Sequence, residues 1–182
     1  MAAVILITGA PASGKTTLAR ELAERLRLPV LSKDRIKETL FDALEDVRTD
    51  ALGNASFHLL MQLVGDLVRG SSAFVVENAF RASDGAALRQ RLAGAEVLHI
   101  HCDASHATLR ARMGQRAASG ERHPSHRYAD LPSARETYAP PPVCSEVLTV
   151  PTDDFSSPQY RAAVDNVVAR ATLFTRRGTR CL

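Results

Sequence analysis

The segment of residues 9–16 constrains the fold of this chain more than any other feature. It reads GAPASGKT, which has the spacing of the phosphate-binding motif GxxxxGK[ST]. A β-branched apolar run, residues 3–8, precedes it, and an amphipathic helical pattern begins at its end. A strand, a glycine-rich turn and a helix N-terminus in this order aim several backbone N–H groups at one anion. The segment therefore predicts a loop that binds nucleotide phosphates.

Apolar runs alternate with segments of helical period along the rest of the chain. The helical segments carry apolar side chains at regular spacing, as at Leu18, Leu22 and Leu26. This alternation predicts an α/β fold with a doubly wound, five-stranded, mainly parallel sheet flanked by helices. At 182 residues we expect one domain, residues 1–182, in which the irregular segment 114–142 forms a lid and connector. The expected strands are residues 3–8, 29–32, 73–77, 96–102 and 146–150.

Composition narrows the class of protein and of partner. The three cysteines are widely spaced and form no CxxC pair, so we expect no disulfide framework and a reducing cytoplasmic setting. The first apolar run is too short for a signal peptide or a membrane span, and we expect no membrane partner. A formal charge of +3 is a small excess, so a nucleic-acid partner is possible but not favoured. The oligomeric state is left open.

The motif assigns roles to the side chains that bind nucleotide. Lys15 is expected to reach the β- and γ-phosphates, and the hydroxyl of Thr16 to ligate Mg²⁺. Glu77 ends an apolar strand, where a carboxylate commonly holds Mg²⁺ through water, although a plain surface acid is the alternative. We therefore expect ATP and Mg²⁺ as cofactors, with the choice of ATP over GTP left open. The expected nucleotide contacts are Gly9, Ala10, Pro11, Ala12, Ser13, Gly14, Lys15, Thr16 and Thr17.

The run GAPASGKTTLARELAERLRLPVLSKDRIKETLFD resembles the start of a group of small P-loop kinases. This group includes polynucleotide 5′-kinases, chloramphenicol phosphotransferase, zeta-type toxins and gluconate kinase. Loops of the group often read GxPGSGKST, so Ala12 stands at a variable position where glycine is common. The resemblance continues in weaker form through residues 74–78 and 98–116. It implies a fold similar to nucleoside-monophosphate kinases, with a small AAA-type ATP-binding domain.

Asp34 directly follows the second expected strand, and ligands bind beyond the carboxyl ends of strands in such sheets. Its carboxylate could orient an acceptor hydroxyl and take its proton. In the kinases that the segment resembles, an aspartate in a matching turn has this role, with a basic residue nearby that Arg35 or Lys37 would match. The alternative is that Ser32 or Asp34 simply caps the following helix. After the third strand, Asn78, Phe80 and Arg81 are further residues expected to face the acceptor pocket.

Arg112 and Arg116 are four residues apart on the helix expected after the fourth strand. They look like the RxxxR lid of small P-loop kinases, whose guanidinium groups balance charge on the transferring phosphoryl group. Solvated surface arginines are the alternative, and for Arg122 and Arg127 we weigh the two interpretations equally.

Four histidines raise the question of a metal site. A transition-metal site is weakly indicated, because strand and lid histidines have no reason to converge and Mg²⁺ prefers oxygen ligands. Lid histidines that contact substrate or phosphate are more plausible. The residues concerned are His99 and His101 in a strand, and His123 and His126 in the lid.

The leading hypothesis is an ATP-dependent kinase that phosphorylates a hydroxyl of a small molecule, with Lys15, Asp34, Arg112 and Arg116 as catalytic residues. A polynucleotide 5′-kinase and a nucleotide-dependent ATPase or switch are the alternatives. Residues 41–57 are expected to help shape the acceptor pocket, but they do not identify the acceptor. The charged residues named for this role are Glu45, Asp46, Arg48 and Asp50.

Overall fold

The computed structural model describes residues 1–45, 48–119, 123–126 and 138–178. Its centre is a five-stranded sheet with the order β2-β3-β1-β4-β5, in which every pairing is parallel. The doubly wound α/β fold expected from the sequence is confirmed, and each of the five expected strands is present to within one residue at either end. The strands are β1 (Ala2–Gly9), β2 (Val30–Ser32), β3 (Ala73–Glu77), β4 (Ala95–Asp103) and β5 (Val147–Pro151).

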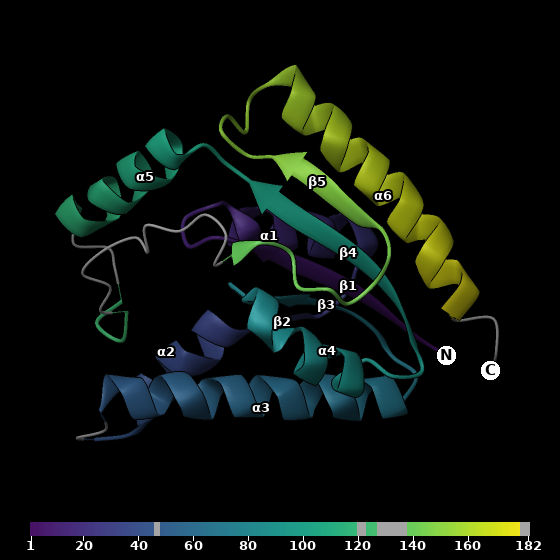
Figure 1. The fold of residues 1–182 in the computed structure, drawn as a ribbon, viewed down its shortest axis with the longest axis horizontal. Helices are drawn as coiled ribbons and strands as arrows, with labels where there is room; N and C mark the ends of the chain where they lie inside the picture. The colour runs from purple at the N-terminus through teal and green to yellow at the C-terminus, as the bar shows by residue number, and fades with distance from the viewer. Residues whose placement is uncertain (46–47, 120–122, 127–137, 179–182) are drawn as a thin grey trace.

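Helices cover both faces of this sheet (Figure 1). One face packs against α1 and α6, through a core cluster that includes Ile5, Leu18 and Val164. The other packs against α3 and α4, through Leu6, Leu60 and Leu88. Alternate residues of β1 point to opposite faces, which is why this fully buried strand is apolar throughout. The helices are α1 (Lys15–Leu26), α2 (Lys33–Ala43), α3 (Thr49–Arg69), α4 (Gly85–Arg91), α5 (His106–Ala118) and α6 (Pro158–Gly178), with a short 3₁₀ turn at Ala82–Asp84.

One expectation about an irregular segment was wrong at its boundary. Residues 114–118 are helical rather than irregular, because Ser105 caps α5 and Gln115, Arg116 and two alanines are good helix formers that extend it. Within residues 41–57, the part from Thr49 onward belongs to α3. Residues 120–122 and 127–137 of the expected lid lie outside the described residues.

All five strands run the same way, so their carboxyl ends meet at one edge of the sheet (Figure 1). β1 lies at the centre, between β3 and β4, and the chain passes from β1 to β2 on one side of it and from β3 to β4 on the other. In open α/β sheets this reversal of strand order opens a crevice at the carboxyl edge, where ligands bind. The glycine-rich loop, α2 and α5 all begin at this edge.

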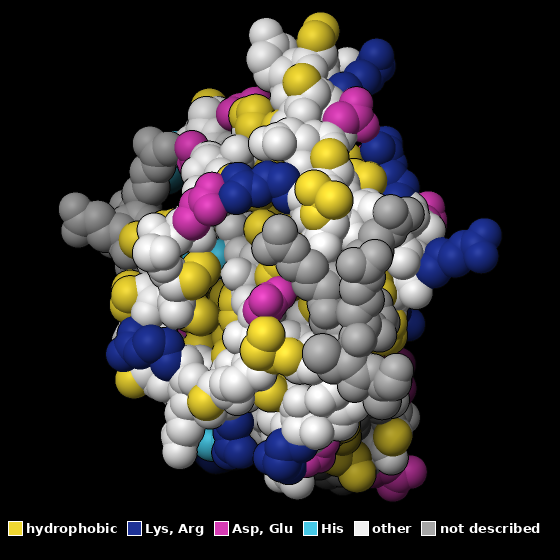
Figure 2. Space-filling model, turned by 90° about the vertical axis from the view of Figure 1, so that its right-hand side faces the viewer, with side chains coloured by type: hydrophobic (Ala, Val, Ile, Leu, Met, Phe, Trp, Pro, Cys, Tyr) yellow, Lys and Arg dark blue, Asp and Glu magenta, His cyan; other side chains and the backbone are white. Residues whose placement is uncertain are grey.

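The surface away from this edge carries charges of both signs. On the described part of the face in Figure 2, basic and acidic side chains are interspersed with small apolar patches. Such a face lacks the continuous positive charge that attracts a nucleic-acid backbone. Among the described residues, none of the helices combines the length and the apolar character needed to cross a bilayer.

The loop between β1 and α1 contains backbone conformations that few residues adopt easily. Gly14 has φ +89°, and a Cβ atom placed there would lie 2.6 Å from the Phe155 ring. Ala12 also has positive φ, at 63°, although it carries a side chain. Glycine is common at this position in similar loops because only glycine takes a left-handed conformation without strain.

These two positions should respond in opposite directions to exchange of glycine and alanine. Ala12→Gly relieves left-handed strain of about 1–2 kcal/mol, partly offset by the greater freedom of glycine in the unfolded chain. We expect the free energy of unfolding to rise by about 0.5 kcal/mol. Gly14→Ala should lower it by more than about 1 kcal/mol, because strain and the clash with Phe155 act together. Urea unfolding measures both values, and an Ala12→Gly variant less stable than the parent would contradict the assignment of strain.

A cluster of three polar side chains lies inside the sheet, next to the loop. The hydroxyl of Thr8 contacts His99 Nε2 at 2.9 Å and His101 Nδ1 at 3.0 Å. His99 is only 1% exposed, and among the described residues its Nδ1 has no hydrogen-bond partner. Burial, followed by the charge of His101, lowers the pKa of His99 to about 4. His99 is therefore neutral in the folded protein at neutral pH.

This histidine should make folding stability depend on pH. Between pH 6.5 and about 4 the unfolded chain binds a proton on His99 that the folded protein excludes, so stability falls as pH falls through this range. From pH 7 to pH 5 the parent should lose about 2 kcal/mol more than His99→Gln, which lacks the titrating group. Urea unfolding of both proteins at the two pH values measures this difference. An equal loss would show that His99 does not resist protonation.

Candidate functional site

A cavity of about 700 Å³ opens at the carboxyl edge of the sheet. Its walls come from the glycine-rich loop, α1, α2, α3, the segment after β3, α5 and the turn at residues 123–126. Segments far apart in the sequence therefore contribute to one concave site of the size that small ligands occupy.

Lys15 lies on the loop side of this cavity and is 8% exposed. Its ammonium donates a 2.7 Å hydrogen bond to the Ala10 carbonyl, so the side chain folds back over the loop. Burial lowers the pKa of Lys15, and the charge of Glu77 is the largest influence that opposes this shift. A buried ammonium with one carbonyl partner is suited to exchange that partner for a phosphate oxygen.

Three oxygen-bearing side chains meet beside Lys15. Glu77 Oε1 accepts hydrogen bonds from Thr16 Oγ1 at 3.2 Å and from Ser32 Oγ at 2.6 Å. Glu77 is 3% exposed, which excludes the alternative of a plain surface acid. Hydroxyl and carboxylate oxygens are the donors that Mg²⁺ prefers, so this set fits the ion. Thr16 and Glu77 are the residues that could hold it.

Asp34 lies in the first turn of α2 and lines the cavity with an exposed side chain. The hydroxyl that caps α2 is that of Ser32, which accepts from the backbone N–H of Arg35 at 3.5 Å. Asp34 is also one of the charges that oppose the burial-induced lowering of the Lys15 pKa, after Glu77 and Cys102. The structure thus leaves the Asp34 carboxylate in the cavity, free of the capping role.

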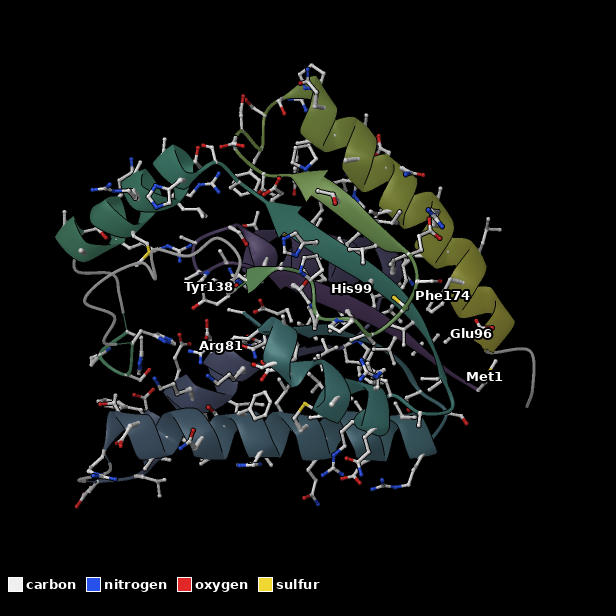
Figure 3. The ribbon with its side chains drawn as sticks, viewed as in Figure 1. Met1, Arg81, Glu96, His99, Tyr138 and Phe174 are labelled. Carbon is white, nitrogen blue, oxygen red and sulfur yellow. The ribbon has the colours of Figure 1, made fainter. Side chains whose placement is uncertain are left out.

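Of the other residues expected to face the acceptor, three line the cavity and two do not. Arg35, Asn78 and Arg81 are in its wall. Lys37 is buried within the fold and lies outside the lining. The expectation for Phe80 was wrong, because its ring is fully buried in the core against α3 and α4. In Figure 3, Arg81 lies at the same end of the sheet as Tyr138, while His99 lies deeper among the strands.

The two arginines of α5 occupy different environments. Arg116 lines the cavity. Arg112 instead donates to the carbonyls of Ala12 at 3.3 Å and Thr152 at 2.6 Å, and its guanidinium lies 4.6 Å from the centre of the Phe155 ring. Arg112 therefore braces the glycine-rich loop against the segment after β5. Arg122 and Arg127 lie outside the described residues.

The histidines also separate into two places. His123 and His126 line the cavity, whereas His99 and His101 flank Thr8 inside the fold. Of the charged residues expected to shape the pocket from residues 41–57, Glu45, Arg48 and Asp50 do not line it, and Asp46 lies outside the described residues. The wall there is formed by Gly53, Asn54 and Phe57 of α3.

Sequence reasoning missed several lining residues. Glu38 is four residues after Asp34, and this spacing on one helix face was a signal that could have found it. Tyr138 is 8% exposed and lines the cavity, but it follows a segment without periodicity, so no pattern indicated it. Asp84 also lines the cavity and accepts from the Arg81 backbone N–H at 2.8 Å.

Comparison with solved structures identifies proteins of the same fold. A protein from Chloroflexus aurantiacus, provisionally described as a kinase, is 29% identical over 95% of this chain and 98% of its own, with a TM-score of 0.79. A gluconokinase from Sinorhizobium meliloti is 20% identical over 96% and 97%, with a TM-score of 0.59. An APS kinase from Mycobacterium tuberculosis, solved with AMPPNP and APS, is 18% identical over 93% and 98%, with a TM-score of 0.61.

Sequence comparison with known families gives the wider relationship. A comparison with curated proteins finds no significant match to this chain. A family model described as an AAA domain matches residues 4–141, which is most of the sequence. That range contains the glycine-rich loop, Asp34, Glu77 and Arg116. The chain therefore belongs to the AAA domain family, and it has the α/β fold of small P-loop kinases.

Proposed function

We propose that this protein is an ATP-dependent kinase that transfers the γ-phosphoryl group to a hydroxyl of a small molecule. The observation that carries the proposal is one cavity that combines Lys15 and Thr16 of the phosphate loop with the Asp34 carboxylate. A phosphate-binding group and a proton acceptor in one concave site are the two parts that phosphoryl transfer to an alcohol requires. The kinase description of the Chloroflexus protein supports the same reading.

The side chains of the cavity have distinct roles in this reaction. Lys15 and Arg116 bind the phosphate oxygens and offset the charge that spreads over them during transfer. Asp34 accepts the proton of the acceptor hydroxyl, whose oxygen then forms a bond to the γ-phosphorus. The bond from the γ-phosphorus to the bridging oxygen of the β-phosphate breaks, and ADP leaves. Mg²⁺ held near Thr16 and Glu77 would supply further neutralisation of the phosphate charge.

The direct test of this function is a screen of hydroxyl compounds. Each compound is incubated with the protein and Mg·ATP, and ADP release is compared with that in the absence of the compound. A kinase should release ADP faster with at least one compound and yield an equal amount of phosphorylated product. ADP release without any product, across a broad panel of alcohols, would show an ATPase instead.

Lys15→Ala should lower turnover by roughly 10²–10³-fold, the range expected when one preorganised electrostatic group is removed. The matched control is Arg110→Ala, which removes an exposed cation of α5 outside the cavity lining. Steady-state ADP release measures turnover, and a thermal melt checks that each variant folds. A folded Lys15→Ala protein with near-parental turnover would remove Lys15 from phosphate binding.

Asp34→Asn should separate nucleotide binding from chemistry. Because the amide cannot take a proton, transfer should fall by about 10²–10⁴-fold, while Mg·ATP affinity stays within a few-fold of the parent. Asp50→Asn, an exposed aspartate outside the cavity, is the control. If Asp34 instead held Mg²⁺, affinity and transfer would fall together and added Mg²⁺ would restore part of both. Transfer at the parental rate would exclude Asp34 as the base.

A further inference from the structure

The turn at residues 123–126 is docked on α2 by two histidine–carboxylate pairs. His126 Nε2 lies 2.9 Å from Glu38 Oε1, and His123 Nε2 lies 3.1 Å from Asp42 Oδ1. Glu38 and Asp42 are four residues apart, so they lie on one face of the helix. The Phe41 ring adds an edge contact to His123, and Ser125 is fully buried. In Figure 1 this short segment lies beside α2.

The two pairs differ in their relation to the cavity. Glu38 and His126 both line it, whereas in the other pair His123 lines it and Asp42 does not. The side chains of Glu38 and His126 are 37% and 11% exposed, whereas that of Asp42 is 68% exposed and faces solvent. Glu38 is also one helical turn after Asp34, so the proposed base and the Glu38–His126 pair share one wall. Only the Glu38–His126 pair therefore has both members in the cavity wall, while the Asp42 carboxylate fastens the turn from outside the cavity.

The hydrogen-bonding capacity of Glu38 is not exhausted by His126. An ionised carboxylate can only accept, so the hydrogen between the two groups is on His126 Nε2. Oε1 takes this bond, and among the described residues no hydrogen bond to Oε2 is found. A carboxylate oxygen at a cavity wall is a suitable acceptor for a ligand hydroxyl, because such bonds are stronger than those between neutral groups.

Charges along the described cavity lining are unevenly distributed. The elements next to the phosphate loop contribute the cations Lys15, Arg20 and Arg116 and no acid. The acceptor end has three acids and three bases, which are Asp34, Glu38 and Asp84 with Lys33, Arg35 and Arg81. A polyanion suits the first end. A neutral molecule rich in hydroxyl groups suits the second, since it can bond to both kinds of group without meeting a net charge.

We propose that the Glu38–His126 pair binds a second hydroxyl of the acceptor, beside the hydroxyl that reacts at Asp34, and that the acceptor is an uncharged polyhydroxylated small molecule. This inference rests on the proposed kinase function, because it concerns the same cavity. The pair acts as a specificity determinant. It holds the acceptor at two points, so a molecule with a single hydroxyl leaves Glu38 without its ligand partner.

The test uses probes that differ in charge and in number of hydroxyls. The neutral polyols glycerol, ribitol and glucose are compared with 1-propanol and with the anion gluconate, in assays of acceptor-dependent ADP release and phosphorylated product. At least one neutral polyol should be an acceptor, and that polyol should be preferred over 1-propanol and gluconate. With AMPPNP and Mg²⁺ present, the preferred polyol should also raise the melting temperature. A better response to gluconate or 1-propanol, or no response to any polyol, would overturn the assigned class.

The residues are tested by a matched pair of variants. Glu38→Gln and Asp42→Asn each weaken one docking contact, but only the first changes the cavity wall. Glu38→Gln should raise KM for the polyol by about 10- to 100-fold, the effect of losing one hydrogen bond to a charged group, with KM for ATP unchanged. Asp42→Asn should leave both values within about two-fold. His126→Gln, which can still donate to Glu38, should retain more affinity than His126→Ala.

Equal effects of Glu38→Gln and Asp42→Asn on the polyol KM would show that both pairs only fasten the turn, and would overturn the assignment. A Glu38→Gln variant with an unchanged KM for the polyol would also overturn it. Failure here is distinct from failure of the kinase proposal. A broad alcohol screen that finds an acceptor of another class keeps the kinase and removes this inference, whereas a screen that finds no phosphorylated product removes both.

Discussion

The site depends on the backbone path between β1 and α1. β1 pairs with a parallel strand on each side along most of its length, so its end is fixed in position. Within the next few residues the chain passes through positive φ at Gly9, Ala12 and Gly14 and enters α1 with its N–H groups directed at the carboxyl edge. Lys15 and Thr16 occupy the first turn of that helix, and their side chains consequently meet Glu77 of the neighbouring strand β3. Without the turn, these groups would not converge.

The sequence predicted the parts of this arrangement that depend on local pattern. The five strands were found because buried parallel strands are continuous apolar runs, and the loop because its residues are contiguous. Asp34 and Glu77 were located because residues at strand ends share one edge of a parallel sheet. Ser32 was one of two named candidates for the cap of α2, and only the backbone geometry chose between them.

The parts that could not be predicted depend on contacts across long stretches of chain. The RxxxR spacing places Arg112 and Arg116 on one helix face, but it does not reveal that Arg112 is satisfied by carbonyls of Ala12 and Thr152. Tyr138 follows a stretch of sequence without apolar periodicity, so no pattern placed it at the cavity. The lid histidines were expected to contact a ligand, but their carboxylate partners on α2 were not. The acceptor wall was thus the least predictable part of the molecule. It combines α2, α3 and the turn at residues 123–126, which are adjacent only after folding.

The bracing of the loop by Arg112 also bears on the thermodynamics of ligand binding. The guanidinium links the Ala12 carbonyl to the segment after β5, and the Phe155 ring beneath it fills the space next to Gly14. The loop is therefore held in shape before any anion arrives, and little conformational entropy remains to be lost on association. The conformational entropy of the loop is lost when the protein folds and not when a ligand binds. The Phe155 ring also makes an edge contact with the Tyr160 ring, so the same links connect the glycine-rich loop to the first turn of α6.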